Sequence, residues 1–102
     1  MKALLPEWQQ SCSEAVRLLA EARDLPPAQM IDVADAALRK TVQARDGMIE
    51  RLREEPDAPP DWRQALGVVN VALTQIAAVE YPGLLNPEHL DEAKKLLEQL
   101  SS

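Results

Sequence analysis

The stretch ALGVVNVALTQIAAVEYP, residues 65–82, is the most apolar part of the chain. A helix built from it would carry apolar side chains on nearly every side, although Asn70, Thr74 and Gln75 interrupt the run. The apolar part, from Ala65 to Val79, is shorter than the roughly 20 apolar residues that a membrane span needs. A helix that is apolar all round is buried in a core or covered by a partner. The stretch therefore predicts the central helix of a helical bundle, with part of its surface available for an interface.

The bulk composition predicts one compact helical domain. The chain has 102 residues, of which 46% are hydrophobic and 27% are charged, as in ordinary globular proteins. This length corresponds to one domain, residues 1–102, with a single core. Aromatic residues make up only 3% of the chain, and Phe is absent. The core must then consist of Leu, Val, Ile and Ala, which is typical of packed helices.

Proline and glycine divide the chain into four segments with helical periodicity and short connections. The residues before and at a proline tend to end a helix, whereas proline is favoured at a first helical position. No sustained alternation of apolar and polar residues indicates a strand. Short connections make consecutive helices antiparallel neighbours, so we predict an all-α, antiparallel four-helix bundle with up-down-up-down topology. Its helices are expected at about residues 6–24, 27–55, 60–81 and 87–100.

The charge pattern argues against two classes of partner. The formal net charge is −6 and is spread along the chain, so no basic face is available to neutralise phosphates. We therefore expect no nucleic acid as a partner. The chain also has no polybasic cluster or lipidation signal, so we expect no membrane partner.

Two features of the sequence suggest a cytoplasmic location. Cys12 is the single cysteine, which permits a reducing compartment. The first ten residues, MKALLPEWQQ, lack the apolar region of a secretory signal. A cytoplasmic location is thus the default expectation.

No combination of residues in the sequence predicts catalysis. One His and one Cys cannot form a structural zinc site, and His89 with Glu92 three residues later is typical of a solvated pair. Cys12 falls on the apolar seam of the first helix, where a buried structural thiol is expected. The three glycines are isolated, so no phosphate-binding loop is present. We predict that the protein is not an enzyme and that it binds no metal and no cofactor.

The helix lengths predict a partner-binding surface at one end of the bundle. At about 1.5 Å per residue, the fourth helix is shorter than the third by roughly 10 Å. It should leave uncovered the end where the second helix meets the third. Trp is enriched at binding hot spots, and Met adapts to varied partners. The predicted partner-binding residues share this end and are Leu5, Trp8, Met48, Ile49, Leu52, Trp62 and Leu66. The alternative is that the two tryptophans simply plug the end of the core.

Two polar residues are candidate buried groups. Asn70 lies in a stripe of small residues at helical spacing with Gly67, Thr74 and Ala78, which would let another backbone approach closely. If so, Asn70 is buried and needs hydrogen-bond partners; otherwise the stripe faces solvent. Arg45 falls on the apolar stripe of the second helix. It could pair with an acid on a neighbouring helix or reach a ligand, or its head could extend to solvent.

These observations favour a protein that acts by contact with other proteins. We expect a small adaptor, an assembly factor or a homodimeric helical bundle, whose partner is another protein or a second copy of the chain. One alternative is a small acidic chaperone of an export system, which holds an amphipathic helix of its partner. Another is a small-molecule-binding or regulatory helical domain with an apolar pocket between its helices.

Overall fold

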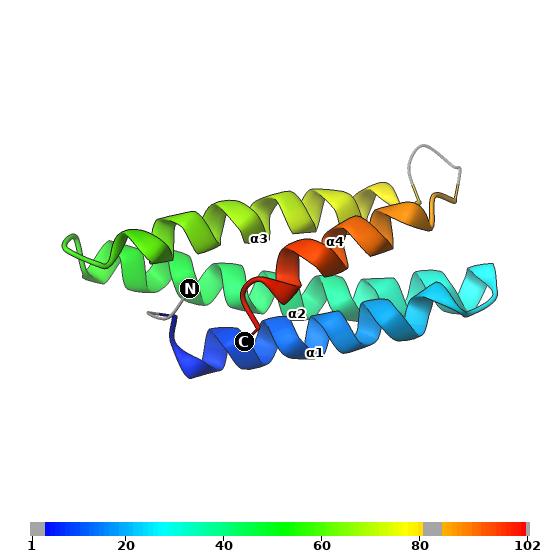
Figure 1. The fold of residues 1–102 in the computed structure, drawn as a ribbon, viewed down its shortest axis with the longest axis horizontal. Helices are drawn as coiled ribbons and strands as arrows, with labels where there is room; N and C mark the ends of the chain where they lie inside the picture. The colour runs from blue at the N-terminus through cyan, green and yellow to red at the C-terminus, as the bar shows by residue number, and fades with distance from the viewer. Residues whose placement is uncertain (1–3, 81–84, 102) are drawn as a thin grey trace.

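The bundle is built from four antiparallel helices. The computed structural model describes residues 4–80 and 85–101. Within them, the helices are α1 (Pro6–Arg23), α2 (Pro27–Glu54), α3 (Pro60–Ala78) and α4 (Glu88–Glu98). Consecutive helices run in opposite directions, and α4 packs against both α3 and α1 (Figure 1). The prediction of an all-α, antiparallel four-helix bundle with up-down-up-down topology is confirmed.

Proline sets the start of three helices. Pro6, Pro27 and Pro60 each stand at the beginning of their helix. The proline ring fixes φ near the helical value, and the missing N–H removes no hydrogen bond in the first turn. None of the four helices in the described residues has a side-chain hydrogen bond at its N-cap. Their starts therefore depend on backbone geometry and on packing.

The helix ends depart from the predicted bounds by a few residues. α1 and α2 end at residues 23 and 54, rather than at 24 and 55. α3 ends at Ala78, and its predicted end at Tyr81 lies outside the described residues. α4 begins at residue 88 rather than 87, and it ends at 98 rather than 100. The last difference arises because the Leu100 N–H donates to the Leu97 carbonyl (3.0 Å) in a tighter turn.

The buried side of α2 is formed mostly by small residues. The larger aliphatic side chains of α2 are only half-buried: Leu38 lines the cavity between α2 and α3, and Leu52 packs against the edge of the core. Small residues at the centre leave less space between helix backbones, so the large side chains are displaced to the border. The buried side chains of α2 are Met30, Ala34, Ala37, Thr41, Ala44 and Met48. Thr41 is tolerated there because its hydroxyl donates to the Ala37 carbonyl at 2.8 Å.

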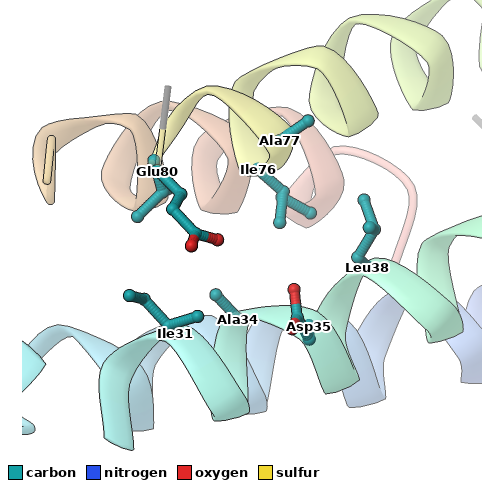
Figure 2. Close-up of a pocket in the computed structure, with 8 residues that line it drawn as sticks. Ile31, Ala34, Asp35, Leu38, Ile76, Ala77 and Glu80 are labelled. Atoms are coloured by element: carbon teal, nitrogen blue, oxygen red, sulfur yellow. The ribbon is translucent and has the colours of Figure 1, made fainter. Parts of the chain in front are cut away.

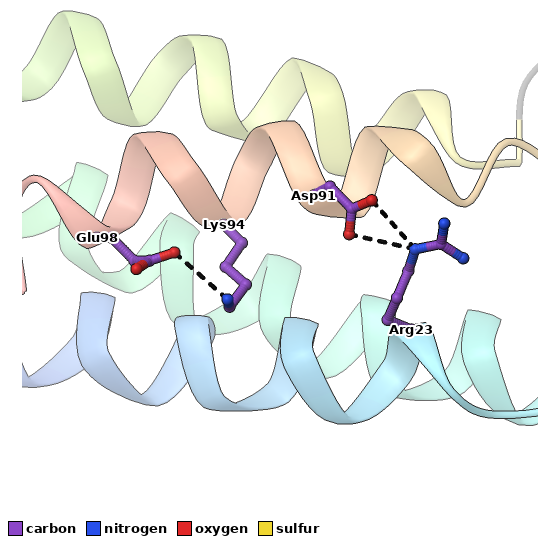
Figure 3. A network of polar contacts seen from close by, with 4 residues as sticks. All are labelled: Arg23, Asp91, Lys94 and Glu98. Carbon is purple, nitrogen blue, oxygen red and sulfur yellow. Dashed lines mark hydrogen bonds and ion pairs between the residues drawn. The ribbon is translucent and has the colours of Figure 1, made fainter.

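Exposed ion pairs join helices at the surface, and Figure 3 shows the pair between α1 and α4. Arg23 at the end of α1 donates from Nε to both carboxylate oxygens of Asp91 on α4, each at 3.2 Å. Nζ of Lys40 on α2 lies 2.9 Å from Oε2 of Glu14 on α1, and this contact lowers the pKa of the Glu14 carboxyl. The side chains of Arg23 and Asp91 are 44% and 51% exposed, so solvent screens the pair. Such exposed pairs contribute only about 0–1 kcal/mol each to stability.

α3 contains residues 65–78 of the most apolar stretch, which supply both its inner and its outer side. Its buried side chains are Trp62, Ala65, Val69, Ala72 and Ile76, and they face the other helices. The opposite side of α3 is exposed. None of the helices in residues 4–80 and 85–101 combines the length and apolar character needed to cross a bilayer.

Two helical glycines should respond oppositely to an added methyl group. A Cβ on Gly67 would meet no atom within 4 Å, whereas a Cβ on Gly47 would lie 2.9 Å from Trp8 Nε1. Gly67→Ala should raise the free energy of unfolding by about 0.5–1 kcal/mol through helix propensity. Gly47→Ala should lower it by roughly 1 kcal/mol, because overpacking strain of about 1–3 kcal/mol exceeds that gain. Urea unfolding followed by circular dichroism measures both. Equal stabilisation by the two substitutions would contradict a tightly held Trp8.

Candidate protein-interaction surface

The two tryptophans meet inside the bundle, at the end that α4 does not reach (Figure 1). Their ring centroids are 4.9 Å apart and the ring planes are 80° apart, an edge-to-face contact. Trp8 is 3% exposed and Trp62 is 4% exposed. Gly47 on α2 makes this possible, because a side chain there would occupy the space of the Trp8 indole. The tryptophans therefore plug the end of the core, which was the alternative to an open groove.

This burial corrects part of the predicted partner-binding surface. Trp8, Met48 and Trp62 are buried in the chain's own core and are not available to a partner in this conformation. The expectation that these three line an exposed groove is wrong, because an edge-to-face pair fills the space where a fourth helix is missing. The other predicted residues are half-buried, and their role in partner binding stays a prediction. They are Leu5, Ile49, Leu52 and Leu66.

Charged side chains cover the tryptophan pair from outside. The guanidinium carbon of Arg51 lies 5.5 Å from the centroid of the Trp62 ring, which is a cation–π arrangement. Arg51 also donates from Nε to Glu55 at 2.8 Å, and this hydrogen bond raises the pKa of the arginine. An open groove of about 270 Å³ lies between α1 and α2, and the buried Trp8 forms part of its floor. The groove is otherwise polar, since Glu7, Ser11, Gln43, Gly47, Glu50 and Arg51 also line it. This end of the bundle thus presents charge to solvent.

The cavity between α2 and α3 is too small for most organic ligands (Figure 2). Its volume is about 40 Å³, whereas small-molecule sites usually span roughly 300–1,000 Å³. Aliphatic side chains, among them Ile31, Leu38 and Ile76, form most of its wall. Asp35 of α2 and Glu80, after the end of α3, bring their carboxylates toward the gap. This cavity has room for little more than a water molecule, so it does not favour the small-molecule alternative.

Neither candidate buried polar group is buried. Asn70 is exposed, and its backbone carbonyl accepts a hydrogen bond from the Thr74 hydroxyl at 3.1 Å. The expectation of a buried Asn70 is wrong, because the side of α3 that packs inward is the one opposite. The Arg45 side chain is 35% exposed and pairs with Asp46 on the same helix at 3.0 Å. Arg45 therefore extends to solvent and joins no neighbouring helix through this pair.

From residue 64 to 78, the exposed side of α3 differs from the exposed sides of the other helices in lacking charge. We call Gly67, Asn70, Val71, Thr74 and Ala77 the α3 outer face; all five are exposed. Within residues 4–80 and 85–101, Val71 is the single large hydrophobic side chain that is exposed, at 50%. The sequence contains no charged residue between Arg63 and Glu80. The other helices expose charged side chains, including Glu7, Arg17 and Glu21 on α1, Asp32, Arg39 and Glu50 on α2, and Glu88, Glu92 and Lys95 on α4.

The nucleophilic and metal-ligating residues form no site within the described part of the chain. Cys12 is fully buried, and this burial raises the pKa of its thiol to about 11. Nδ1 of His89 on α4 lies 2.6 Å from Oε1 of Gln75 on α3, so the single histidine links two helices. Residues 4–80 and 85–101 contain no group of three or more His, Cys, Asp or Glu side chains placed to hold a metal ion.

Comparisons with protein-family models, with curated proteins and with solved structures found no match. A four-helix bundle by itself supports many unrelated functions.

Removing one tryptophan should destabilise the fold strongly. Trp62→Ala should lower the free energy of unfolding by about 3–5 kcal/mol, because a fully packed aromatic ring is lost from the core. The neighbouring Arg63→Ala is the matched control, since Arg63 is exposed and should change stability by less than about 0.5 kcal/mol. Chemical unfolding followed by circular dichroism gives both values. A small effect of Trp62→Ala would contradict its role as a core plug.

The Cys12 thiol should react slowly with thiol reagents in the folded protein. Raising its pKa from 9.0 to about 11 lowers the thiolate fraction at pH 8 about a hundredfold, and burial also blocks access. Labelling of the folded chain should therefore be at least a hundredfold slower than labelling in urea. It should accelerate as the pH rises toward 11, because more thiolate forms. Ser13→Cys in a Cys12→Ser background is the control, since position 13 is exposed and should label rapidly.

Proposed function

We propose that the protein is a non-enzymatic protein–protein interaction module that binds its partner through the α3 outer face. The observation that carries this proposal is the absence of charge on one exposed helix face, in a chain of which 27% is charged. Charged residues are depleted from the cores of protein interfaces relative to the remaining surface. A helix exposed to solvent alone would tolerate charge on that face, as α1, α2 and α4 do.

The shape of the α3 outer face also suits contact with a second helix. Val71 projects an apolar side chain near its middle, and Gly67 and Ala77 lie about one turn or more to either side. No atom lies within 4 Å of the position that a Gly67 Cβ would take. Small residues beside an apolar one let another backbone approach closely, which increases van der Waals contact. Asn70 and Thr74 supply hydrogen-bonding groups at the rim of such a contact.

A reducing, cytoplasmic setting forms part of the proposal. Cys12 is a free, buried thiol, which suits a compartment in which thiols stay reduced.

Site-specific photo-crosslinking tests the proposed function. A photoreactive phenylalanine analogue is placed at Val71 in the full chain, and the protein is irradiated in the cells that produce it. We expect covalent adducts with one defined protein species, which includes a second copy of this chain. The control carries the analogue at Ala20, which is exposed on α1 among charged neighbours and should give far fewer adducts. Equal, diffuse labelling from both positions would overturn the proposal.

A further inference from the structure

Two buried polar groups of α1 line the groove between α1 and α2. Trp8 is 3% exposed and Ser11 is 8% exposed. The ring of Trp8 packs in the core, but its Nε1 lies on the side of Gly47, which also lines the groove. Within residues 4–80 and 85–101, neither the indole N–H nor the Ser11 hydroxyl has a hydrogen-bond partner in the protein, and neither is sealed from solvent. Since buried groups of this kind are normally hydrogen-bonded, these two are open to a ligand in the groove.

The walls of the groove carry two acidic side chains. Glu7 of α1 and Glu50 of α2 are exposed, and neither forms an ion pair among the described residues. Arg51 also lines the groove, but it donates to Glu55, and its guanidinium lies over the Trp62 ring. The groove therefore combines hydrogen-bond donors at its floor with carboxylate acceptors at its walls.

We propose that this groove is a binding site for a primary carboxamide, the group that ends Gln and Asn side chains and small free amides. The amide oxygen accepts hydrogen bonds from Trp8 Nε1 and from the Ser11 hydroxyl. The amide nitrogen carries two N–H groups, which the carboxylates of Glu7 and Glu50 can accept. The site is separate from the α3 outer face, so this inference does not depend on the proposed function.

The same donors and acceptors discriminate against the charged groups of similar shape. A carboxylate has two acceptor oxygens and no N–H, and it would add a negative charge beside Glu7 and Glu50. An ammonium group has three donors and no acceptor, so it would leave the Trp8 indole N–H unpaired. Of these three groups, only the amide matches both the floor and the walls of the groove.

The size of the groove limits the ligand to one such group on a short stem. Its volume of about 270 Å³ lies just below the roughly 300–1,000 Å³ of most small-molecule sites. Gly47 keeps the floor accessible, because a Cβ there would lie 2.9 Å from Trp8 Nε1 and would cover the N–H. An open groove of this size holds a small fragment weakly, so we expect dissociation constants on the order of millimolar.

Nuclear magnetic resonance of the isotope-labelled full chain tests the site. The Trp8 indole proton is identified by its nuclear Overhauser contact with the Hα protons of Gly47, and the chain is titrated with propionamide, propionate and propylammonium. Propionamide should shift the Trp8 indole signal and saturate in the millimolar range, whereas the two charged analogues should bind at least tenfold more weakly. A Trp8 signal that propionamide does not shift, or equal binding of all three compounds, would overturn the proposal.

A serine pair on α1 supplies matched variants. Ser11→Ala removes the hydroxyl from the groove and should weaken propionamide binding at least threefold. Ser13→Ala makes the same change on the exposed side of α1 and should leave the dissociation constant unaltered. Circular dichroism verifies that both variants keep their helices. Equal binding by the Ser11→Ala variant and the wild-type chain would contradict a site at the floor of this groove.

A second titration distinguishes two sources of the amide. The peptide acetyl-Gly-Gln-Gly-N-methylamide carries its single primary carboxamide on a side chain, and the Gly-Glu-Gly counterpart replaces that group with a carboxylate. Tighter binding of the Gln peptide than of propionamide, lost in the Glu peptide, would identify the ligand as a side chain of a partner protein. Binding of propionamide without binding of the Gln peptide would identify it as a free small amide. Equal binding of the Gln and Glu peptides would overturn amide recognition.

Discussion

The edge-to-face contact between Trp8 and Trp62 is the interaction on which the rest of the bundle depends. α4 has 11 residues and α3 has 19, so three helices must close one end of the core without the fourth. The paired rings supply the volume that a longer α4 would have filled, and Gly47 supplies the space for one of them. Arg51 then screens the rings from water. The two tryptophans thus close this end of the core with side chains of the chain itself.

The small residues of the core determine where the remaining apolar surface lies. Ala34, Ala37 and Ala44 bring α2 close to its neighbours, and larger aliphatic side chains of α2 such as Leu38 are only half-buried. α3 accordingly buries one side completely and exposes the opposite side to solvent. From residue 64 to 78 this exposed side carries no charge, whereas α1, α2 and α4 all expose charged side chains. This contrast in exposed charge is the property that distinguishes the α3 outer face from the rest of the described surface.

The sequence was sufficient to predict the helical architecture, but it was not sufficient to predict which side chains are exposed. Pro6, Pro27 and Pro60 mark helix starts because proline constrains the backbone locally, and a local constraint can be read without knowing the fold. Burial depends on where neighbouring helices lie. Helical periodicity alone does not show that Asn70 faces solvent. It also does not show that Trp8 of α1 and Trp62 of α3 contact each other inside the bundle. The charge-free run from residue 64 to 79 was visible in the sequence, but its exposure was not.

The uncapped, proline-led helix starts have a consequence for the denatured chain. Proline reduces the number of conformations that an unfolded chain can occupy, so it lowers the entropy lost on folding. Three of the four helices begin in this way, and none of the four described helices relies on a capping side chain. Part of the stability at these helix starts therefore comes from the lower entropy of the unfolded chain and not from contacts in the folded protein. It is also insensitive to acid and salt, because it involves no carboxylate whose protonation or screening could weaken it.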